Sequence, residues 1–220
     1  MFHLGFFLFQ APDTEEVGAA QNIIDIIIDG GILSMSIFGV LLILSVISVY
    51  IFFERYLTIK RAGRIDENFM NNIRSAVAAG NIEGAKAACA STDSPMARMV
   101  EKGLQRIGKP LRDIDAAIEN IGNLEVFKLE KNLSTLASIA GAAPMIGFFG
   151  TVTGMILAFQ TMATEENVGP AQLAEGIYQA LLTTAFGLMI GIIAFVGYNL
   201  LVANVEKVIF KMERVTTDFM

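Results

Sequence analysis

The sequence is poor in the side chains that bind metals and carry out acid–base or nucleophilic chemistry. Its 220 residues include one cysteine, Cys89, and one histidine, His3. A single cysteine excludes an internal disulfide and a cysteine-based metal cage. No apolar segment brings together an acid, a base, a nucleophile or metal ligands. We therefore expect neither an enzyme nor a bound cofactor or metal, and we interpret Cys89, which lies among alanines, as a small core residue.

Basic residues are absent from two long stretches. All 16 lysines and arginines lie within residues 55–131 or 207–214, and none lies within 1–54 or 132–206. In membrane proteins, Lys and Arg gather in the cytoplasmic segments. Both basic regions are therefore predicted to be cytoplasmic, with the N-terminus and the loop 164–174 outside. The formal net charge of −6 gives no reason to expect nucleic acid as a ligand.

Apolar residues, in contrast, are abundant and clustered. They make up 54% of the chain, above the roughly 45–50% of ordinary soluble domains. Three blocks, 31–54, 134–163 and 175–204, are each long enough to cross a bilayer, which takes about 20 residues as a helix. The sequence therefore predicts an all-α integral membrane protein with three transmembrane helices.

The remaining segments have helical patterns of other kinds. Residues 55–133 mix charges with apolar residues at helical period and predict a cytoplasmic helical domain, in which Ser94-Pro95 begins one helix. From Pro110 onward we expect one very long helix that continues into the second span. Residues 205–220 predict a cytoplasmic C-terminal helix that extends the third span and packs on the helical bundle.

Residues 1–30 are predicted to form a periplasmic tail and a short amphipathic helix, in which Asp25 and Asp29 share one face. Residues 1–11 are apolar but lack the positive region of a signal peptide. Cleavage after Ala11 stays open, although we favour a retained tail that lies at the membrane surface.

Small residues recur at helical spacing in the second and third spans. In lipid, such faces let helix backbones approach closely, because packing drives association there. The residues assigned to helix packing are Gly147, Gly150, Gly154, Gly176, Gly187 and Gly191. Hydroxyls on the same faces point into a bundle or a pore. The alternative for each threonine is a bond to the carbonyl four residues earlier in its own helix.

Two motifs in these spans are similar to those of a known family. The second span contains PMIGFFGTVTGM (144–155), which resembles the second-span motif of the MotA/TolQ/ExbB proton-channel proteins. The third contains GIYQALLTTAFGL (176–188), which resembles their third span, and Tyr198-Asn199 resembles its end. Three spans, an external N-terminus and one large cytoplasmic insertion match the ExbB and TolQ branch, since MotA-like members have a fourth span.

The resemblance implies a homopentamer in the bacterial inner membrane that encloses a pore. Single helices from two copies of an ExbD- or TolR-like partner sit inside and supply the titrating aspartate, and a TonB- or TolA-like protein is a further partner. Proton flow through this stator drives work at the outer membrane or in the envelope. Thr151 and Thr184 match the pore threonines, and Thr183 and Gln179 are placed with them along the proton pathway.

Two positions depart from the family pattern. Gln179 stands where ExbB and TolQ usually carry a pore glutamate, and Ile193 stands where they usually carry proline. MotA-like channels also lack a carboxylate at the first position, so a channel function survives, but the coupling ion stays open. An amide in lipid is costly, and plain bonding between helices is the alternative role for Gln179.

Two functions follow from these observations. The first is a proton-channel stator subunit that works with a partner helix. The second is a non-conducting membrane scaffold that only holds such a helix. The sequence does not distinguish nutrient uptake, envelope maintenance and surface motility, nor does it name the partners.

Overall fold

The described part of the chain is helical throughout. The computed structural model describes residues 31–64, 68–164 and 169–220, and these contain no strand. The predicted tail and amphipathic helix of residues 1–30 lie outside the described residues, as do residues 165–168 of the predicted loop. The helices of the described residues are α2 (Gly31–Ala62), α3 (Phe69–Ala78), α4 (Ile82–Ala90), α5 (Pro95–Leu104), α6 (Leu111–Glu130), α7 (Leu133–Thr164) and α8 (Pro170–Phe219).

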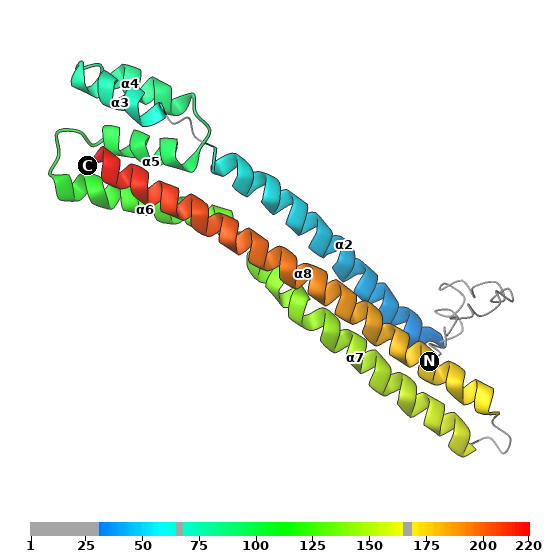
Figure 1. Ribbon diagram of the computed structural model, residues 1–220. Coiled ribbons are helices and arrows are strands. Elements are labelled where there is room, and N and C mark those ends of the chain that lie inside the picture. Colours follow the sequence, from blue (N-terminus) through cyan, green and yellow to red (C-terminus); the bar gives the residue numbers. More distant parts are fainter. Residues whose placement is uncertain (1–30, 65–67, 165–168) are drawn as a thin grey trace, which may run out of the picture.

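Three long helices form the elongated part of the molecule. α7 and α8 lie side by side, and α2 lies against α8 (Figure 1). All three are long and apolar enough to cross a membrane, and large apolar side chains such as Leu42, Val46 and Ile192 are exposed on their outer faces. Water would penalise so much exposed apolar surface, whereas lipid does not. The prediction of a multi-pass membrane protein with three spanning helices is confirmed.

The helix α8 reaches well beyond the membrane. Its 50 residues, at about 1.5 Å per residue, extend roughly 75 Å, whereas the hydrocarbon core is about 30 Å thick. Its last third packs against the shorter helices through buried Val205, Val208, Met212 and Val215. The C-terminal segment is thus a continuous extension of the third span, lying among the short helices at one end of the molecule (Figure 1).

The helices α3, α5 and α6 pack against this extension, and α4 packs on α3 and α5. Their shared core includes Ile73, Met96, Leu104 and Ile118, each at most 2% exposed. The hydroxyl of Ser94 accepts a hydrogen bond from the backbone N–H of Ala97 at 3.1 Å and so caps α5, as predicted. Cys89 is also buried in this core, at 2% exposed.

The expected single helix from Pro110 onward is wrong in one respect. α6 ends at Glu130 and α7 begins at Leu133, with Lys131 in an extended conformation between them. Asn132 has a φ of 64°, in the left-handed region that asparagine tolerates better than other residues with a side chain. The helix therefore breaks at an asparagine, a residue whose sequence signal is weaker than that of glycine or proline.

Candidate functional site

The site is built on an unusually close approach of α7 and α8. A Cβ added to Gly147 would lie 2.7 Å from the carbonyl oxygen of Thr183, and one added to Gly187 would lie 2.6 Å from that of Ala143. Because these neighbours are backbone atoms, no larger side chain fits without moving a helix. The other four glycines assigned to packing, Gly150, Gly154, Gly176 and Gly191, also face atoms of the opposite helix.

Three threonine hydroxyls meet at this contact. The hydroxyl of Thr184 on α8 donates to the carbonyl of Gly147 on α7 at 3.1 Å and contacts the hydroxyl of Thr151 directly. The Thr151 hydroxyl lies 3.1 Å from the carbonyl of Ala180, across the interface, and 3.4 Å from that of Gly147 in its own helix. The Thr183 hydroxyl donates to the carbonyl of Ala180 in its own helix at 2.7 Å and lies 3.1 Å from the carbonyl of Gly147 on α7. The hydroxyls thus bridge two helices rather than only bonding within their own.

The three threonines differ in access. Thr183 is 2% exposed and is enclosed between α7 and α8. Thr151 and Thr184 are half-buried, so part of each side chain remains open to a neighbour. The neighbouring Thr153 is different again, because its hydroxyl bonds only to carbonyls of its own helix, at 2.9 Å to Phe149 and 3.1 Å to Gly150.

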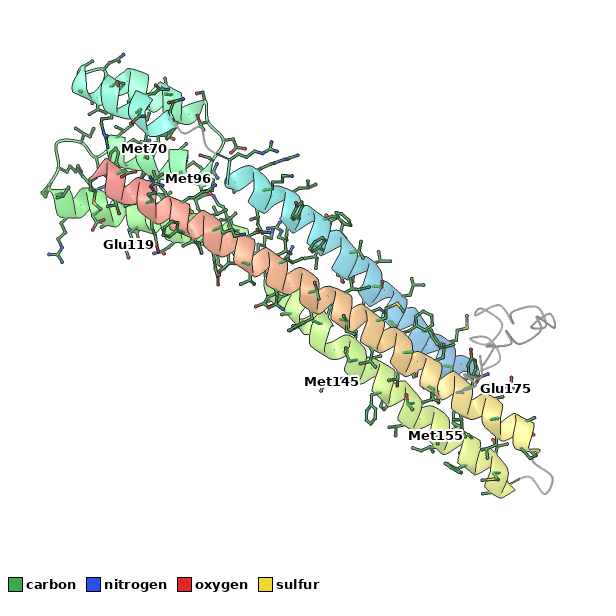
Figure 2. All side chains as sticks on the ribbon, viewed as in Figure 1. Met70, Met96, Glu119, Met145, Met155 and Glu175 are labelled. Atoms are coloured by element: carbon green, nitrogen blue, oxygen red, sulfur yellow. The ribbon has the colours of Figure 1, made fainter. Side chains whose placement is uncertain are left out.

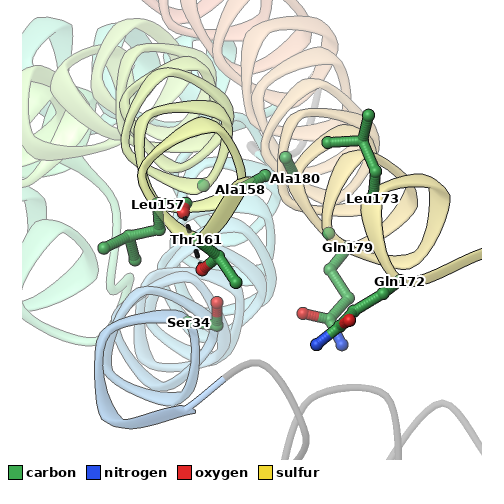
Figure 3. A pocket seen from close by; sticks show the side chains of 10 residues that line it. Ser34, Leu157, Ala158, Thr161, Gln172, Leu173, Gln179 and Ala180 are labelled. Carbon is green, nitrogen blue, oxygen red and sulfur yellow. Dashed lines mark hydrogen bonds between the residues drawn. The ribbon is translucent and has the colours of Figure 1, made fainter. Parts of the chain in front are cut away.

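Gln179 lies on a separate cavity beside this cluster. The cavity has a volume of about 240 Å³ and lies between α7, α8 and the start of α2. Figure 3 shows the amides of Gln179 and Gln172 extending in the same direction from α8, with Ser34 of α2 nearby. The other lining residues are Gly154, Leu157, Ala158, Thr161, Leu173, Gly176 and Ala180. Gly154 and Ala180 connect the cavity to the hydroxyl cluster, since Ala180 provides one of its carbonyl acceptors.

Charged side chains are remote from the cluster. Residues 31–53, 132–164 and 176–203 contain no Asp, Glu, Lys, Arg or His. Glu175 lies near the start of α8, and Glu119 lies on α6 at the other end of the molecule (Figure 2). Among the described residues, no group of three metal-ligating side chains gathers in one place. The cluster can donate, accept and orient hydrogen bonds, but it cannot itself take up a proton near neutral pH.

A buried ionic network in the helical bundle was missed by the sequence analysis. Glu125 of α6 is 3% exposed and accepts hydrogen bonds from Arg98 at 2.6 Å and Lys128 at 2.7 Å. Burial raises the pKa of Glu125, but the bonds from these two cations outweigh it and hold the pKa below its ordinary value. A signal was present, because Glu125 falls on the apolar stripe of Ile118 and Leu129 at helical spacing.

Comparison with known proteins agrees with this architecture. The sequence model of the MotA/TolQ/ExbB proton channel family matches residues 91–214. The chain belongs to the MotA/TolQ/ExbB proton channel family. The matched residues run from the residue after α4 through most of α8, so they contain the hydroxyl cluster and Gln179, while α2, α3 and α4 lie outside the match.

Relatives in this family carry the names of its ExbB and TolQ branch. An ExbB homologue of biopolymer transport from Methanothermobacter thermautotrophicus is 32% identical over 54% of this chain and 42% of its own length. The Tol-Pal system protein TolQ of Pseudomonas aeruginosa is 31% identical over 58% of this chain and 60% of its own. A biopolymer transport protein of Synechocystis, named ExbB-like 1, is 25% identical over 90% of this chain and 77% of its own. The match thus spans 42% and 60% of the length of the first two relatives.

Proposed function

We propose that this chain is the channel-forming subunit of a proton-driven stator, and that the titrating carboxylate belongs to a separate single-span partner. The observation that carries the proposal is the Thr151–Thr184 hydroxyl pair, half-buried within apolar segments (132–164 and 176–203) that contain no Asp, Glu, Lys, Arg or His. A proton does not cross roughly 30 Å of hydrocarbon without titratable groups or ordered water. The partner helix supplies the group that this chain lacks.

The hydrogen-bond arrangement suits a carboxyl group that alternates between two charge states. Each of the three hydroxyl protons has an acceptor inside the chain, at Gly147, at Ala180 or at another hydroxyl. The hydroxyl oxygens of Thr151 and Thr184 keep lone pairs that accept from a neutral carboxyl group. When the carboxyl loses its proton, rotation of one hydroxyl away from Gly147 gives the anion a donor. The cluster therefore serves both states without moving a helix.

Family membership and the distribution of basic residues support the following assembly and orientation. Five copies of this chain surround two copies of an ExbD- or TolR-like helix, with α7 and α8 toward the axis and α2 toward lipid. The site is in the inner membrane of a bacterium, with the bundle of α3 to α6 in the cytoplasm and the N-terminus in the periplasm. Proton flow then drives motion that a TonB- or TolA-like protein carries to the outer membrane.

The test is proton flux into liposomes under an imposed potential, with and without the partner. Thr184→Val keeps the shape of the side chain and removes its hydroxyl. We expect flux to fall about 10–100-fold, because a hydrogen bond to a charged group contributes about 1.5–3 kcal/mol. Thr151→Val should behave in the same way or nearly so. A pull-down of the partner should show that assembly is intact.

Thr153→Val is the matched control. It removes a hydroxyl from α7, the helix that carries Thr151. This hydroxyl bonds only to carbonyls of its own helix, so flux should stay near the wild-type value. Full flux from the Thr151→Val/Thr184→Val double variant would refute the role of the cluster. Flux from this chain without any partner would refute the external carboxylate, and a complex that binds the partner but never conducts would be a scaffold.

A further inference from the structure

An apolar cavity at membrane depth lies between α2 and α8, with Leu136 of α7 also on its wall. Its volume is about 450 Å³. Phe52 stands at its wall and is stacked on Tyr56, with ring centroids 6.1 Å apart. The residues that line the cavity are Ser48, Val49, Phe52, Phe53, Leu136, Ile192, Ile193, Ala194, Val196, Gly197 and Leu200.

A second cavity continues the same groove toward the helical bundle. Its volume is about 270 Å³, and its walls carry four cations and no carboxylate. Tyr56 follows Phe52 by four residues on α2, and Asn204 follows Leu200 by four on α8, so both cavities lie on one face of each helix. The residues that line it are Tyr56, Ile59, Lys60, Gly63, Arg64, Asn204, Lys207, Val208 and Lys211.

The four cations of this basic cavity lack acidic partners within the described chain. No salt bridge of residues 31–64, 68–164 or 169–220 involves Lys60, Arg64, Lys207 or Lys211. The ammonium of Lys211 donates to the carbonyl of Gly63 at 2.9 Å, and that of Lys60 lies 5.6 Å from the centre of the Tyr56 ring. Four like charges around one small cavity repel each other, and a bound anion relieves that repulsion.

The basic cavity lies at the depth of lipid headgroups. The first span ends near Glu54, so Lys60 is about 9 Å further along the helix at about 1.5 Å per residue. The interfacial layer extends roughly 5–8 Å beyond the hydrocarbon on each side, and lysine side chains reach back toward the membrane by several ångströms. The cations can therefore meet phosphates of the same leaflet that fills the apolar cavity.

We propose that the α2–α8 groove is a binding site for an anionic glycerophospholipid. Its phosphate occupies the basic cavity between Lys60, Arg64, Lys207 and Lys211, and an acyl chain occupies the apolar cavity along Phe52 and Leu200. A free phosphate would account for the basic cavity but would leave the apolar cavity empty. A second copy of this chain would fit only if it placed carboxylates opposite the four cations. The consecutive apolar and basic cavities match a phospholipid in both parts.

The test is lipid binding to the purified full-length chain, measured by native mass spectrometry in detergent. Phosphatidylglycerol and phosphatidylcholine with identical acyl chains are titrated separately. We expect phosphatidylglycerol to bind more tightly, and K207Q/K211Q to weaken it by at least about tenfold, since each lysine near an anionic lipid contributes about 1 kcal/mol. The matched control K109Q/R112Q removes two exposed cations from the far end of the bundle and should leave binding unchanged.

Two further experiments distinguish a bound lipid from a free anion and from a second copy of this chain. Millimolar inorganic phosphate should not displace the lipid, and displacement would identify a free-anion site and overturn the lipid. Val49→Cys and Val196→Cys, combined with Cys89→Ala, place single thiols on the walls of the apolar cavity. Each thiol is coupled to a photoreactive benzophenone maleimide, because identical positions do not face each other around a five-fold ring. An efficient crosslink between copies from either position would place another chain there and overturn the proposal, as would equal binding of the two lipids.

Discussion

The guanidinium of Arg55 on α2 donates to the backbone carbonyl of Lys128 on α6, with the Nη1 and O atoms 3.1 Å apart. Arg55 is 6% exposed, and its Nε also donates to Glu54 at 3.0 Å. The carbonyl lies in the last turn of α6, where the chain leaves the helix and Asn132 adopts its positive φ. A side chain from another helix thus satisfies a carbonyl that the break leaves without its helical partner.

Replacing this arginine should loosen the joint between α6 and α7. Arg55→Gln removes the bond to Lys128 and the ion pair with Glu54, and we expect the amides of residues 131–136 to exchange hydrogen at least about tenfold faster, which is about 1.4 kcal/mol of local stability. Arg61→Gln is the control, because Arg61 is exposed on the same helix. Unchanged exchange in Arg55→Gln would mean that the break is held by other contacts.

The stability of the bundle should depend on Glu125 at acid pH. Its pKa is held below the ordinary value of 4.5 by Arg98 and Lys128, so the folded state binds the proton more weakly than the unfolded chain. The contribution is therefore fully present above pH 4.5 and is lost as the pH falls through the lowered pKa. Burial opposes this shift but does not reverse it.

Glu125→Gln should remove that dependence. At neutral pH we expect the variant to be less stable by about 1–2 kcal/mol, because the buried side chain at position 125 loses its charge-assisted bonds to Arg98 and Lys128. The difference in the midpoint of thermal unfolding between wild type and variant should shrink as the pH falls below 4.5, through the lowered pKa of Glu125. Glu119→Gln, exposed on the same helix, should show no such difference. If the difference in stability between wild type and Glu125→Gln were the same at every pH, the substitution would act through packing and not through the charge of Glu125.

The sequence predicts those features of the fold that depend on local patterns. Length and hydropathy give the three spanning helices, and the Ser94-Pro95 pair gives the start of α5. The break at Asn132 was not predicted, because asparagine is a weaker signal for a helix end than glycine or proline, and Arg55, which bonds to the last turn of α6, is distant in sequence. The ion pair between Glu125 and Arg98 was not predicted, because only folding brings α5 against α6 and so places these two residues together.

For the candidate site, the sequence gives residue types but not their partners. Small residues at helical spacing indicate a close contact, and the structure places Gly147 opposite Gly187. Which hydroxyls meet depends on the register between α7 and α8. A hydroxyl bonded to its own helix was the alternative for each threonine, and Thr151 uses both kinds of acceptor. The register between α7 and α8 also decides that Thr183 is enclosed and Thr184 only half-buried. No local sequence pattern encodes that register.

Gly187→Ala should separate α7 from α8. The added Cβ would lie 2.6 Å from the carbonyl oxygen of Ala143 and 2.9 Å from Cα of Gly147, so a helix must move, at about 1–3 kcal/mol. We expect a lower midpoint of thermal unfolding in detergent. Gly39→Ala is the control, since nothing lies within 4 Å of its added Cβ, and it should be neutral or slightly stabilising. Equal midpoints for the two variants would argue against tight packing at Gly187.

Topology is tested by labelling with a membrane-impermeant maleimide. A cysteine at Glu165 should be labelled from outside intact cells, and a cysteine at Arg106 should be labelled only after the membrane is opened. Burial raises the pKa of the Cys89 thiol to about 11, so little reactive thiolate forms there at neutral pH, and Cys89→Ala removes the remaining background. The reverse pattern would overturn the orientation inferred from the basic residues.

The last prediction concerns the path by which a proton reaches the hydroxyl cluster. The cavity of about 240 Å³ that Gln179 lines is large enough for several waters, and Gly154 and Ala180 connect it to the hydroxyl cluster. Gln179 forms no hydrogen bond with another described residue, so its amide is free to hold water in this cavity. Gln179→Leu should therefore dry the cavity and lower partner-dependent flux, whereas Gln179→Glu keeps an acceptor for water and should be tolerated.

Gln160→Leu is the matched control for this last prediction, since Gln160 is exposed on α7 and does not line the cavity. Flux is measured with the partner in liposomes, beside Thr184→Val. The cavity adjoins the hydroxyl cluster. If both Gln179→Leu and Thr184→Val lower proton flux, the result indicates one path that runs from the cavity through the hydroxyls. Wild-type flux from Gln179→Leu, with flux lowered in Thr184→Val, would show that protons reach the hydroxyl cluster by another route, past the partner helix itself.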